Sequence, residues 1–208
     1  HIQIFDPTQP PADAGQDQEL CTPADSTFLD ATTPIFPAHG TWSLVQGAGF
    51  IFDANDPATQ VSGLAIGDNV FQWTVYNGPC NYVDSVAFVT ITLFDDSTAA
   101  ANAGPDQEVC LPLTSTTMAA DIPQPPASGT WTLLGGSGTI ADPSDPLTDI
   151  SDLQVGISTF IWTLDNGPCA NNGLLTDTMT IYIYDPSAPS ADAGPDQELC
   201  TPQDSTVM

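Results

Sequence analysis

Five cysteines are the residues of this sequence whose type and spacing are most open to chemistry. Cys21, Cys110 and Cys200 recur 89 and 90 positions apart, and Cys80 and Cys169 are also 89 apart. The cysteines form no C-x-x-C motif and have no histidine near them, so neither a zinc site nor a redox motif is indicated. The spacing instead predicts disulfide bonds, which require an oxidising, extracellular environment.

Two matching aspartate pairs are the candidate metal ligands. Asp53 and Asp56 lie in one loop, and Asp142 and Asp145 lie in the corresponding loop 89 positions later. Carboxylates and carbonyl oxygens are the ligands that Ca²⁺ prefers. The same residues also form turns without an ion, because an aspartate accepts hydrogen bonds from the backbone that follows it. The sequence therefore leaves Ca²⁺ open as a ligand and indicates no other cofactor.

Composition excludes several kinds of partner. The 208 residues include no Lys or Arg and 26 Asp or Glu, which gives a formal net charge of −26. Nucleic acid is excluded, because phosphate binding depends on Lys and Arg. No apolar run approaches the roughly 20 residues that span a bilayer. No enzyme is expected either, since His39 corresponds to Ser128 in the repeat and a nucleophile with its base cannot be assembled.

An internal repeat positions these residues. Residues 12–21 read ADAGQDQELC, residues 101–110 read ANAGPDQEVC, and residues 191–200 read ADAGPDQELC. A fixed period makes the chain an array of one unit. We expect residues 1–6 to be the closing strand of a preceding repeat. Residues 12–96 and 101–185 then form complete repeats, and residues 191–208 start a further one.

Each repeat has the pattern of a β-sandwich. Residues 69–76 alternate, with Phe71, Trp73 and Val75 on one face, and an Asn-Gly-Pro-Cys turn follows them. Seven short strands are expected in the first unit, at residues 18–21, 26–30, 40–45, 50–52, 60–64, 69–76 and 85–94. The sequence thus predicts an all-β fold of tandem Ig-like β-sandwiches of about 89 residues, arranged like beads on a string.

The repeat motifs resemble a known group of proteins. The AGPDQ opening, the Gly-Thr-Trp strand at residues 40–42, the stretch 63–74 and the turn at residues 77–80 resemble the Ig-like, PKD-type repeats of giant Bacteroidota cell-surface proteins. Such proteins are typically exported by type IX secretion, and their arrays serve as adhesins, filaments and stalks. The resemblance covers the whole chain and implies an extracellular, cell-surface location.

Two periodic pairings of the cysteines fit the spacing. Cys21–Cys80 and Cys110–Cys169 would close 59-residue spans within each unit, whereas Cys80–Cys110 and Cys169–Cys200 would close spans of 30 and 31 residues across the junctions. Loop-closure entropy is about 4 kcal/mol for either set and does not decide. A small core gains from its own staple, and the Ig-like order of Cys, Trp and Cys favours pairing within the unit. That pairing is our expectation, and it leaves Cys200 without a partner in this sequence.

Short Asp-Ser and Asp-Thr sequences resemble the O-glycosylation motif of Bacteroidota. The candidate acceptors are Ser26, Ser85, Ser97, Thr178 and Ser205. The same dipeptides are common at strand starts, so solubilising glycans and plain strand starts both stay open.

Four tryptophans could stack on sugars or fill the cores. Trp42, Trp73, Trp131 and Trp162 lie at alternating strand positions. That placement predicts burial against a disulfide, as in Ig-like domains.

The function expected from these features is structural. The chain would be a repeat unit of an extracellular filament or of a giant adhesin stalk, giving length and resistance to force and proteolysis. Its partners would be further copies of the repeat in the same chain, or other filament chains. The alternatives are a surface- or carbohydrate-binding adhesin module, and a subunit that polymerises when residues 1–6 add a strand to a neighbouring chain.

Overall fold

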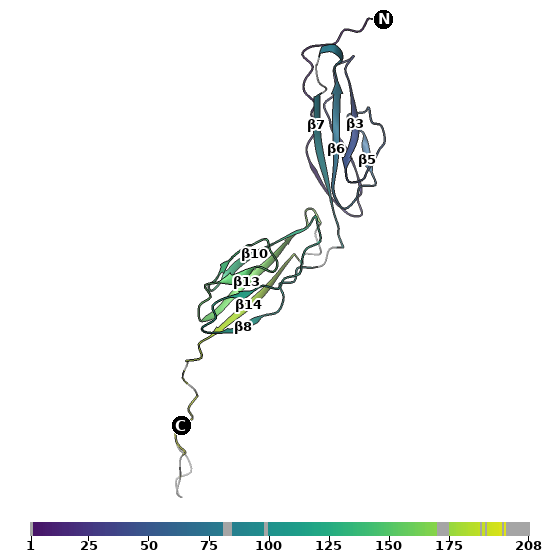
Figure 1. Ribbon diagram of the computed structural model, residues 1–208. Coiled ribbons are helices and arrows are strands. Elements are labelled where there is room, and N and C mark those ends of the chain that lie inside the picture. Colours follow the sequence, from purple (N-terminus) through teal and green to yellow (C-terminus); the bar gives the residue numbers. More distant parts are fainter. Residues whose placement is uncertain are drawn as a thin grey trace.

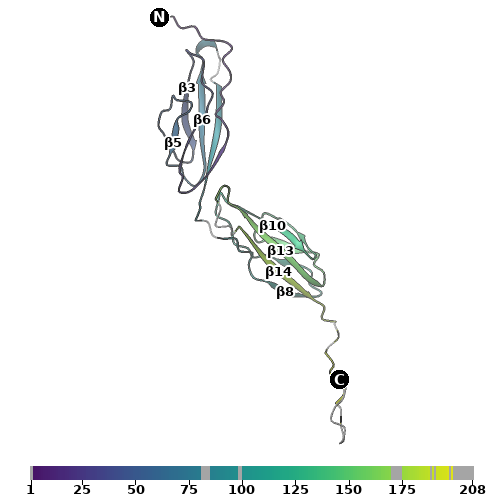
Figure 2. The same ribbon diagram turned by 180° about the vertical axis from the view of Figure 1, so that it is seen from behind.

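The computed structural model describes residues 2–80, 85–97, 100–169, 175–187, 189, 191–196 and 198. Figure 1 shows two β-rich units that follow one another along the chain, and Figure 2 shows the same arrangement from behind. Each described sheet takes its strands from one unit only. The expected all-β fold of tandem sandwiches is confirmed.

The described residues of unit 1 form seven strands in two sheets. The four-stranded sheet has the order β1 (Gln18–Cys21), β7 (Ser85–Phe94), β6 (Gly67–Tyr76) and β3 (His39–Gln46). The three-stranded sheet has the order β2 (Ser26–Phe28), β5 (Gln60–Ser62) and β4 (Phe50–Ile51). A short 3-10 turn, η1 (Gly78–Cys80), follows β6.

Unit 2 repeats this topology. One sheet has the order β10 (Ser128–Gly135), β13 (Gly156–Asp165), β14 (Thr176–Tyr184) and β8 (Gln107–Cys110). The other has the order β11 (Thr139–Ile140), β12 (Asp149–Ser151) and β9 (Thr116–Thr117). In both units the first strand pairs in parallel with the last one, β1 with β7 and β8 with β14. This arrangement of two facing sheets is an Ig-like sandwich.

The core of each unit follows from side-chain alternation along the long strands. On β6, Phe71, Trp73 and Val75 are buried, whereas the side chains between them are only half-buried. Trp73 lies opposite Trp42 on β3, with ring centroids 5.0 Å apart. Trp131 and Trp162 form the same pair in unit 2, at 5.1 Å. The tryptophan pairs are therefore the centres of two separate cores.

The Asp-Gln pair of the opening motif attaches the first strand to the rest of the unit. The Asp17 carboxylate accepts a hydrogen bond from the Thr90 amide at 2.8 Å. The Gln18 side chain donates to the Phe28 carbonyl oxygen at 3.0 Å, which connects β1 to the opposite sheet. In unit 2 the same contacts join Asp106 to Thr180 and Gln107 to Thr117. The recurring motif is therefore architectural.

The segments outside the two sandwiches are less regular. The described residues 2–6 belong to no strand. Their assignment to the end of a preceding unit, and that of residues 191–208 to the start of a further one, stay predictions. Within the described part of the chain, no helix is long and apolar enough to cross a membrane.

Candidate functional site at the junction of the two units

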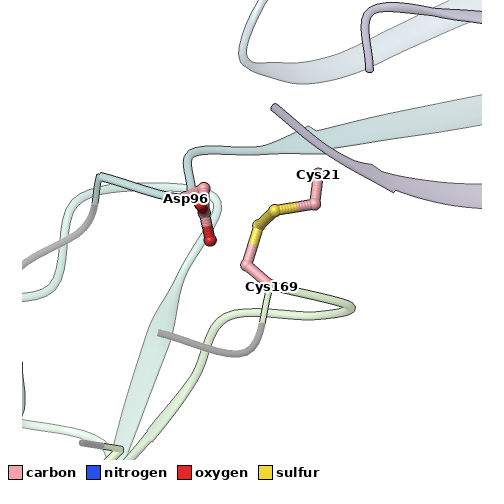
Figure 3. Close-up of side chains that lie close together, drawn as sticks. All are labelled: Cys21, Asp96 and Cys169. Atoms are coloured by element: carbon pink, nitrogen blue, oxygen red, sulfur yellow. A yellow bond between two sulfur atoms is a disulfide. The ribbon is translucent and has the colours of Figure 1, made fainter. Parts of the chain in front are cut away.

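A disulfide bond joins the two units. Cys21 at the end of β1 is bonded to Cys169 in the turn that follows β13, with Cα atoms 5.3 Å apart (Figure 3). The two residues are 148 positions apart in the sequence. The bond therefore staples unit 1 to unit 2, beside the linker that already connects them.

The expected Cys21–Cys80 pairing is wrong, because strand direction separates the two residues. Cys21 lies opposite Phe94, where the chain leaves unit 1; we call this the trailing end. The turn that carries Cys80 follows β6, whose Val75 lies opposite Ser85 at the other, leading end of the same sheet. The ten residues of β7 hold these ends roughly 30 Å apart. A disulfide needs Cα atoms about 4.4–6.8 Å apart.

Neither the other expected pairing nor the alternative set across the junctions is formed, and Cys169–Cys200 is ruled out because Cys169 is bonded to Cys21. Cys110 lies opposite Tyr184 at the trailing end of unit 2, and Cys169 belongs to its leading end, so the Cys110–Cys169 bond is wrong for the same reason. A Cys80–Cys110 bond would join the outer ends of two consecutive units. Cys80 and Cys110 are instead exposed free thiols among the described residues. Cys200 lies outside the described residues.

Unit 1 holds the start of the linker by two hydrogen bonds. The Thr22 amide donates to the carbonyl oxygen of Phe94, the last residue of β7, at 3.0 Å. The Asp96 amide in turn donates to the Thr22 hydroxyl at 2.9 Å. The residue after Cys21 thus ties the linker to the strand that carries the disulfide.

Unit 2 holds the same linker residues from the other side. The Asn166 side chain donates to the Asp95 carbonyl oxygen at 3.0 Å. The Phe94 ring packs against Gly167, where an added Cβ would overlap the ring. Gly167 also has a φ of +52°, which favours glycine. The Asn-Gly-Pro-Cys turn is therefore a docking site for the linker as well as the carrier of Cys169.

A compact turn within the linker bends the chain between these two attachments. The Asp95 carboxylate accepts hydrogen bonds from the Ser97 amide at 2.8 Å and the Ser97 hydroxyl at 2.7 Å. These hydrogen bonds, the hydroxyl first, lower the pKa of Asp95 below its ordinary value of 3.8. The same turn occurs at Asp6 with Thr8 and at Asp185 with Ser187. An Asp-x-Ser/Thr turn thus follows β7 and β14, and the same turn follows residues 2–5, which belong to no strand.

Asp96 is the charged neighbour of the disulfide. A carboxylate oxygen of Asp96 and the sulfurs of Cys21 and Cys169 lie within 4.8 Å of one another (Figure 3). The two sulfurs are bonded to each other, so they supply no thiolate for a metal ion. The arrangement instead places a negative charge beside the bond.

The aspartates of the candidate calcium loops have a structural role. The Asp53 carboxylate accepts from the Asn55 amide at 2.9 Å, and that of Asp56 accepts from the Ala58 amide at 3.0 Å. Asp142 and Asp145 cap the corresponding loop of unit 2 in the same way. The turn-forming role weighed from the sequence is thus present. Binding of Ca²⁺ to these four residues stays a prediction.

The candidate glycan acceptors differ in their surroundings. The Ser85 hydroxyl is half-buried and accepts from the Ala12 amide at 2.8 Å. Ser97 belongs to the linker turn, Thr178 is exposed on β14, and Ser26 is half-buried on β2. Ser205 lies outside the described residues. Glycosylation at these positions stays a prediction.

The tryptophans are unavailable to a sugar. All four are at most 2 % exposed, so their predicted burial is confirmed. The expected contact with a disulfide within the unit is wrong, because each indole packs against its partner indole and the bond lies at the junction. His39, the remaining candidate for chemistry, packs against the Tyr76 ring at 5.1 Å.

Sequence reasoning missed the linker-docking residues Asn77 and Asn166 and the linker turn at Asp95 and Ser97. Two signals were present. The combination of an aromatic residue, Asp, any residue and Ser or Thr occurs at residues 5–8, 94–97 and 184–187. A third periodic pairing was also open, in which an opening-motif cysteine bonds to the turn cysteine one unit further along.

Fold and junction together define a class of protein: a tandem array of Ig-like β-sandwiches joined by a linker and a disulfide. No protein-family model matches the sequence. The chain is 28 % identical over 208 residues to the "Dyslexia-associated protein KIAA0319 homolog" of Mus musculus, covering 93 % of this chain and 19 % of that protein. It therefore spans about a fifth of the length of this relative.

Solved structures include similar chains. The solution structure of the PKD domain from KIAA 1837 protein is 30 % identical in sequence, with a TM-score of 0.36, over 44 % of this chain and 92 % of that domain. Extracellular domains 3–5 of Drosophila OTK are 13 % identical, with a TM-score of 0.39, over 88 % of this chain and 62 % of theirs.

Proposed function

We propose that this chain is a stretch of an extracellular filament or of the stalk of a cell-surface adhesin. Its function would be to set distance and to carry force, with each Ig-like unit adding one domain length. Export to the cell surface, by type IX secretion as in the Bacteroidota proteins that it resembles, is part of the proposal. Its partners would be further units of the same repeat.

The disulfide between Cys21 and Cys169 is the observation that carries this proposal. A single peptide linker lets two domains rotate about it, as is usual for domains with a small interface. A second covalent attachment beside the linker restricts both bending and twisting. A disulfide at this position serves a rod better than it serves either core, and it requires an oxidising compartment.

The composition supports the same function. With no Lys or Arg in 208 residues, the chain offers no cleavage site to trypsin-like proteases. The net charge of −26 disfavours lateral clumping of such rods, because like charges repel. Both properties suit a long, exposed extracellular structure.

The alternative functions gain less from the structure. Burial of the four tryptophans removes the aromatic surface on which a carbohydrate-binding module would rely. Strand addition by residues 1–6 has no support in the contacts of Phe5 and Asp6, which lie against the Asn77–Cys80 turn of their own chain. The filament or stalk is therefore the function we propose.

Immunogold electron microscopy of the producing cells tests the proposal. An antibody raised against residues 1–208 should label thin surface fibres or stalks at many points along their length. Label confined to soluble secreted material would contradict the proposed function. A second measurement compares the angle between units in negative-stain images of the chain and of its Cys21→Ser/Cys169→Ser variant. The angle distribution should be narrow in the first and broad in the second.

A further inference from the structure

The two free thiols of the described chain occupy the positions of the bonded pair. Cys80 follows Asn77-Gly78-Pro79 at the leading end of unit 1, as Cys169 follows Asn166-Gly167-Pro168 in unit 2. Cys110 ends β8 opposite Tyr184, as Cys21 ends β1 opposite Phe94. Each free thiol is thus one half of the arrangement that the Cys21–Cys169 bond completes.

The surroundings of Cys80 already contain most of a junction. The Asn77 side chain donates to the Asp6 carbonyl oxygen at 2.8 Å, and the Phe5 ring lies against Gly78 where a Cβ would overlap it. These are the contacts that Asn166 and Gly167 make with Asp95 and Phe94. The Cys80 sulfur lies 3.4 Å from the Phe5 carbonyl oxygen. The leading end of unit 1 therefore holds a docked linker of the same kind.

Residues 2–5, which lead into this linker, have the side-chain pattern of a closing strand. Ile2 and Ile4 are 89 % and 82 % exposed, whereas their counterparts Ile91 and Leu93 are 0 % and 2 % exposed on β7. Residues 2–5 thus carry the alternation of a closing strand, and the described residues do not bury it. At the docking turn, the Asn77 side chain is 1 % exposed, as is that of Asn166 in the bonded junction.

The surroundings of Cys110 form the opposite half. The Leu111 amide donates to the Tyr184 carbonyl oxygen at 3.0 Å, as Thr22 does to Phe94. The Asp185 carboxylate accepts from Ser187, as that of Asp95 does from Ser97. Among the described residues, the trailing end of unit 2 therefore has the strand end, the linker turn and the thiol of such a junction.

We infer that Cys80 and Cys110 are two further junction sites, each of which forms a disulfide with another unit of the same repeat. Cys80 bonds to the opening-motif cysteine of a unit before it, and Cys110 bonds to the turn cysteine of a unit after it. Every unit is thereby bonded to both neighbours, and the bonds form a continuous ladder along the array.

The chemistry of each step is thiol–disulfide exchange. Two thiols lose two protons and two electrons and form one S–S bond, and an oxidant of the disulfide class, such as oxidised glutathione, is reduced to two thiols. The inference goes beyond the proposed function, since the ladder could exist in an array that forms no fibre. A negative immunogold result would therefore contradict only the proposed function, and a negative disulfide map would contradict only this inference.

Disulfide mapping of the natural protein from the producing cells tests the ladder directly. Thiols are alkylated before lysis, and the protein is digested with pepsin, because trypsin has no site and low pH prevents exchange. The peptides that contain Cys80 and Cys110 should each be recovered in a disulfide with a peptide from another unit. Recovery of either as an alkylated thiol, as a mixed disulfide with a small thiol, or bonded to the other would overturn the inference.

A lengthened chain provides the matched test. A copy of residues 30–97 placed after Met208 completes a third unit, whose turn contains a copy of Cys80. In a glutathione redox buffer, Cys110 should bond to that copy, while Cys21–Cys169 forms as the internal control for folding. Cys110→Ser should leave the copy reactive toward iodoacetamide. Pairing of Cys110 with any other cysteine would overturn the inference, as would a reactive Cys110 in a chain whose third unit is protected from hydrogen exchange.

Discussion

Gly129 on β10 faces the Trp162 indole on β13 so closely that a Cβ at this position would overlap the ring. Gly40 and Trp73 have the same relationship in unit 1. The glycine lets the indole approach the backbone of the neighbouring strand closely, next to the tryptophan with which it pairs. The Gly-Thr-Trp motif of each unit is therefore a packing device for two tryptophans.

Gly129→Ala should destabilise unit 2 by about 1–3 kcal/mol, because the added methyl forces the indole or the strand to move. Gly135→Ala is the matched control on the same strand, where an added Cβ meets no atom within 4 Å, and its effect should stay within about 1 kcal/mol. Hydrogen exchange resolved by unit measures both effects. Equal protection of the two variants would contradict this account of the motif.

Asn69 in unit 1 and Ser158 in unit 2 offer a comparison between repeats. The Asn69 side chain is 0 % exposed and bonds the Ala48 and Ala65 amides and the Ile91 carbonyl oxygen. Ser158 bonds the Ser137 amide at the corresponding place.

Asn69→Ala leaves several buried groups unsatisfied and should destabilise unit 1 by about 2–4 kcal/mol, whereas Ser158→Ala should cost unit 2 about 1–2 kcal/mol. Unit-resolved hydrogen exchange again gives the measurement. The reverse order of the two losses would show that Asn69 is not the anchor of these loops.

Removal of the junction disulfide should lower the stability of the chain while the cores persist. The bond closes a span of 148 residues, for which the chain-entropy estimate is about 5 kcal/mol, distributed over both units. Cys21→Ser/Cys169→Ser should therefore melt at lower temperature, with the tryptophan fluorescence of the folded state unchanged before the transition. Cys80→Ser/Cys110→Ser is the control, and its melting temperature should match that of the parent chain.

Asp96 should protect the disulfide from reduction. Its carboxylate lies within 4.8 Å of both sulfurs, and two unit charges at such a distance interact by about 1 kcal/mol in water. An attacking thiolate is therefore repelled, and Asp96→Asn should speed reduction by glutathione by about threefold to fivefold. The difference between the two proteins should shrink at 1 M salt, because salt screens exposed charges. An acceleration that salt does not change would rule out a charge effect.

The linker turn should loosen in acid. Because the pKa of folded Asp95 is lowered from 3.8, its stabilising contribution is fully present above that ordinary value. The contribution is lost as the pH falls through the lowered value of the folded state. NMR titration of the carboxyl carbon should give a pKa below 3.8 for Asp95, and Ser97→Ala should raise it toward 3.8. Ser144→Ala is the control, since it removes only the equivalent hydroxyl hydrogen bond to Asp142.

Strand positions could be predicted because they depend on local alternation. Residues 85–94 were expected as a strand and form β7 (Ser85–Phe94), since every second side chain from Val89 onward had to be apolar to meet the opposite sheet. The tryptophan positions followed from the same pattern. The order of neighbouring residues determines which face of a strand is buried, so no knowledge of distant contacts was required.

The cysteine partners could not be derived in this way. The local sequence around Cys21 and Cys80 does not show at which end of the unit each cysteine lies. Only the parallel pairing of β1 with β7 puts them at opposite ends. Pairing direction depends on contacts between residues more than 70 positions apart, such as Gln18 and Ile91. The Ig-like precedent of a bond between the two sheets was misleading here, because Cys21 and the Cys80 turn lie at opposite ends of the same sheet in unit 1.

The covalent loop from Cys21 to Cys169 changes how the molecule would respond to tension between its two termini. The load passes from Cys21 through the sulfur atoms to Cys169, so residues 22–168 between them are not part of the loaded path. That segment could supply roughly 500 Å of contour length if it were pulled straight. This length cannot be released for as long as the sulfur–sulfur bond is intact, so stretching can draw out only the residues on either side of the loop.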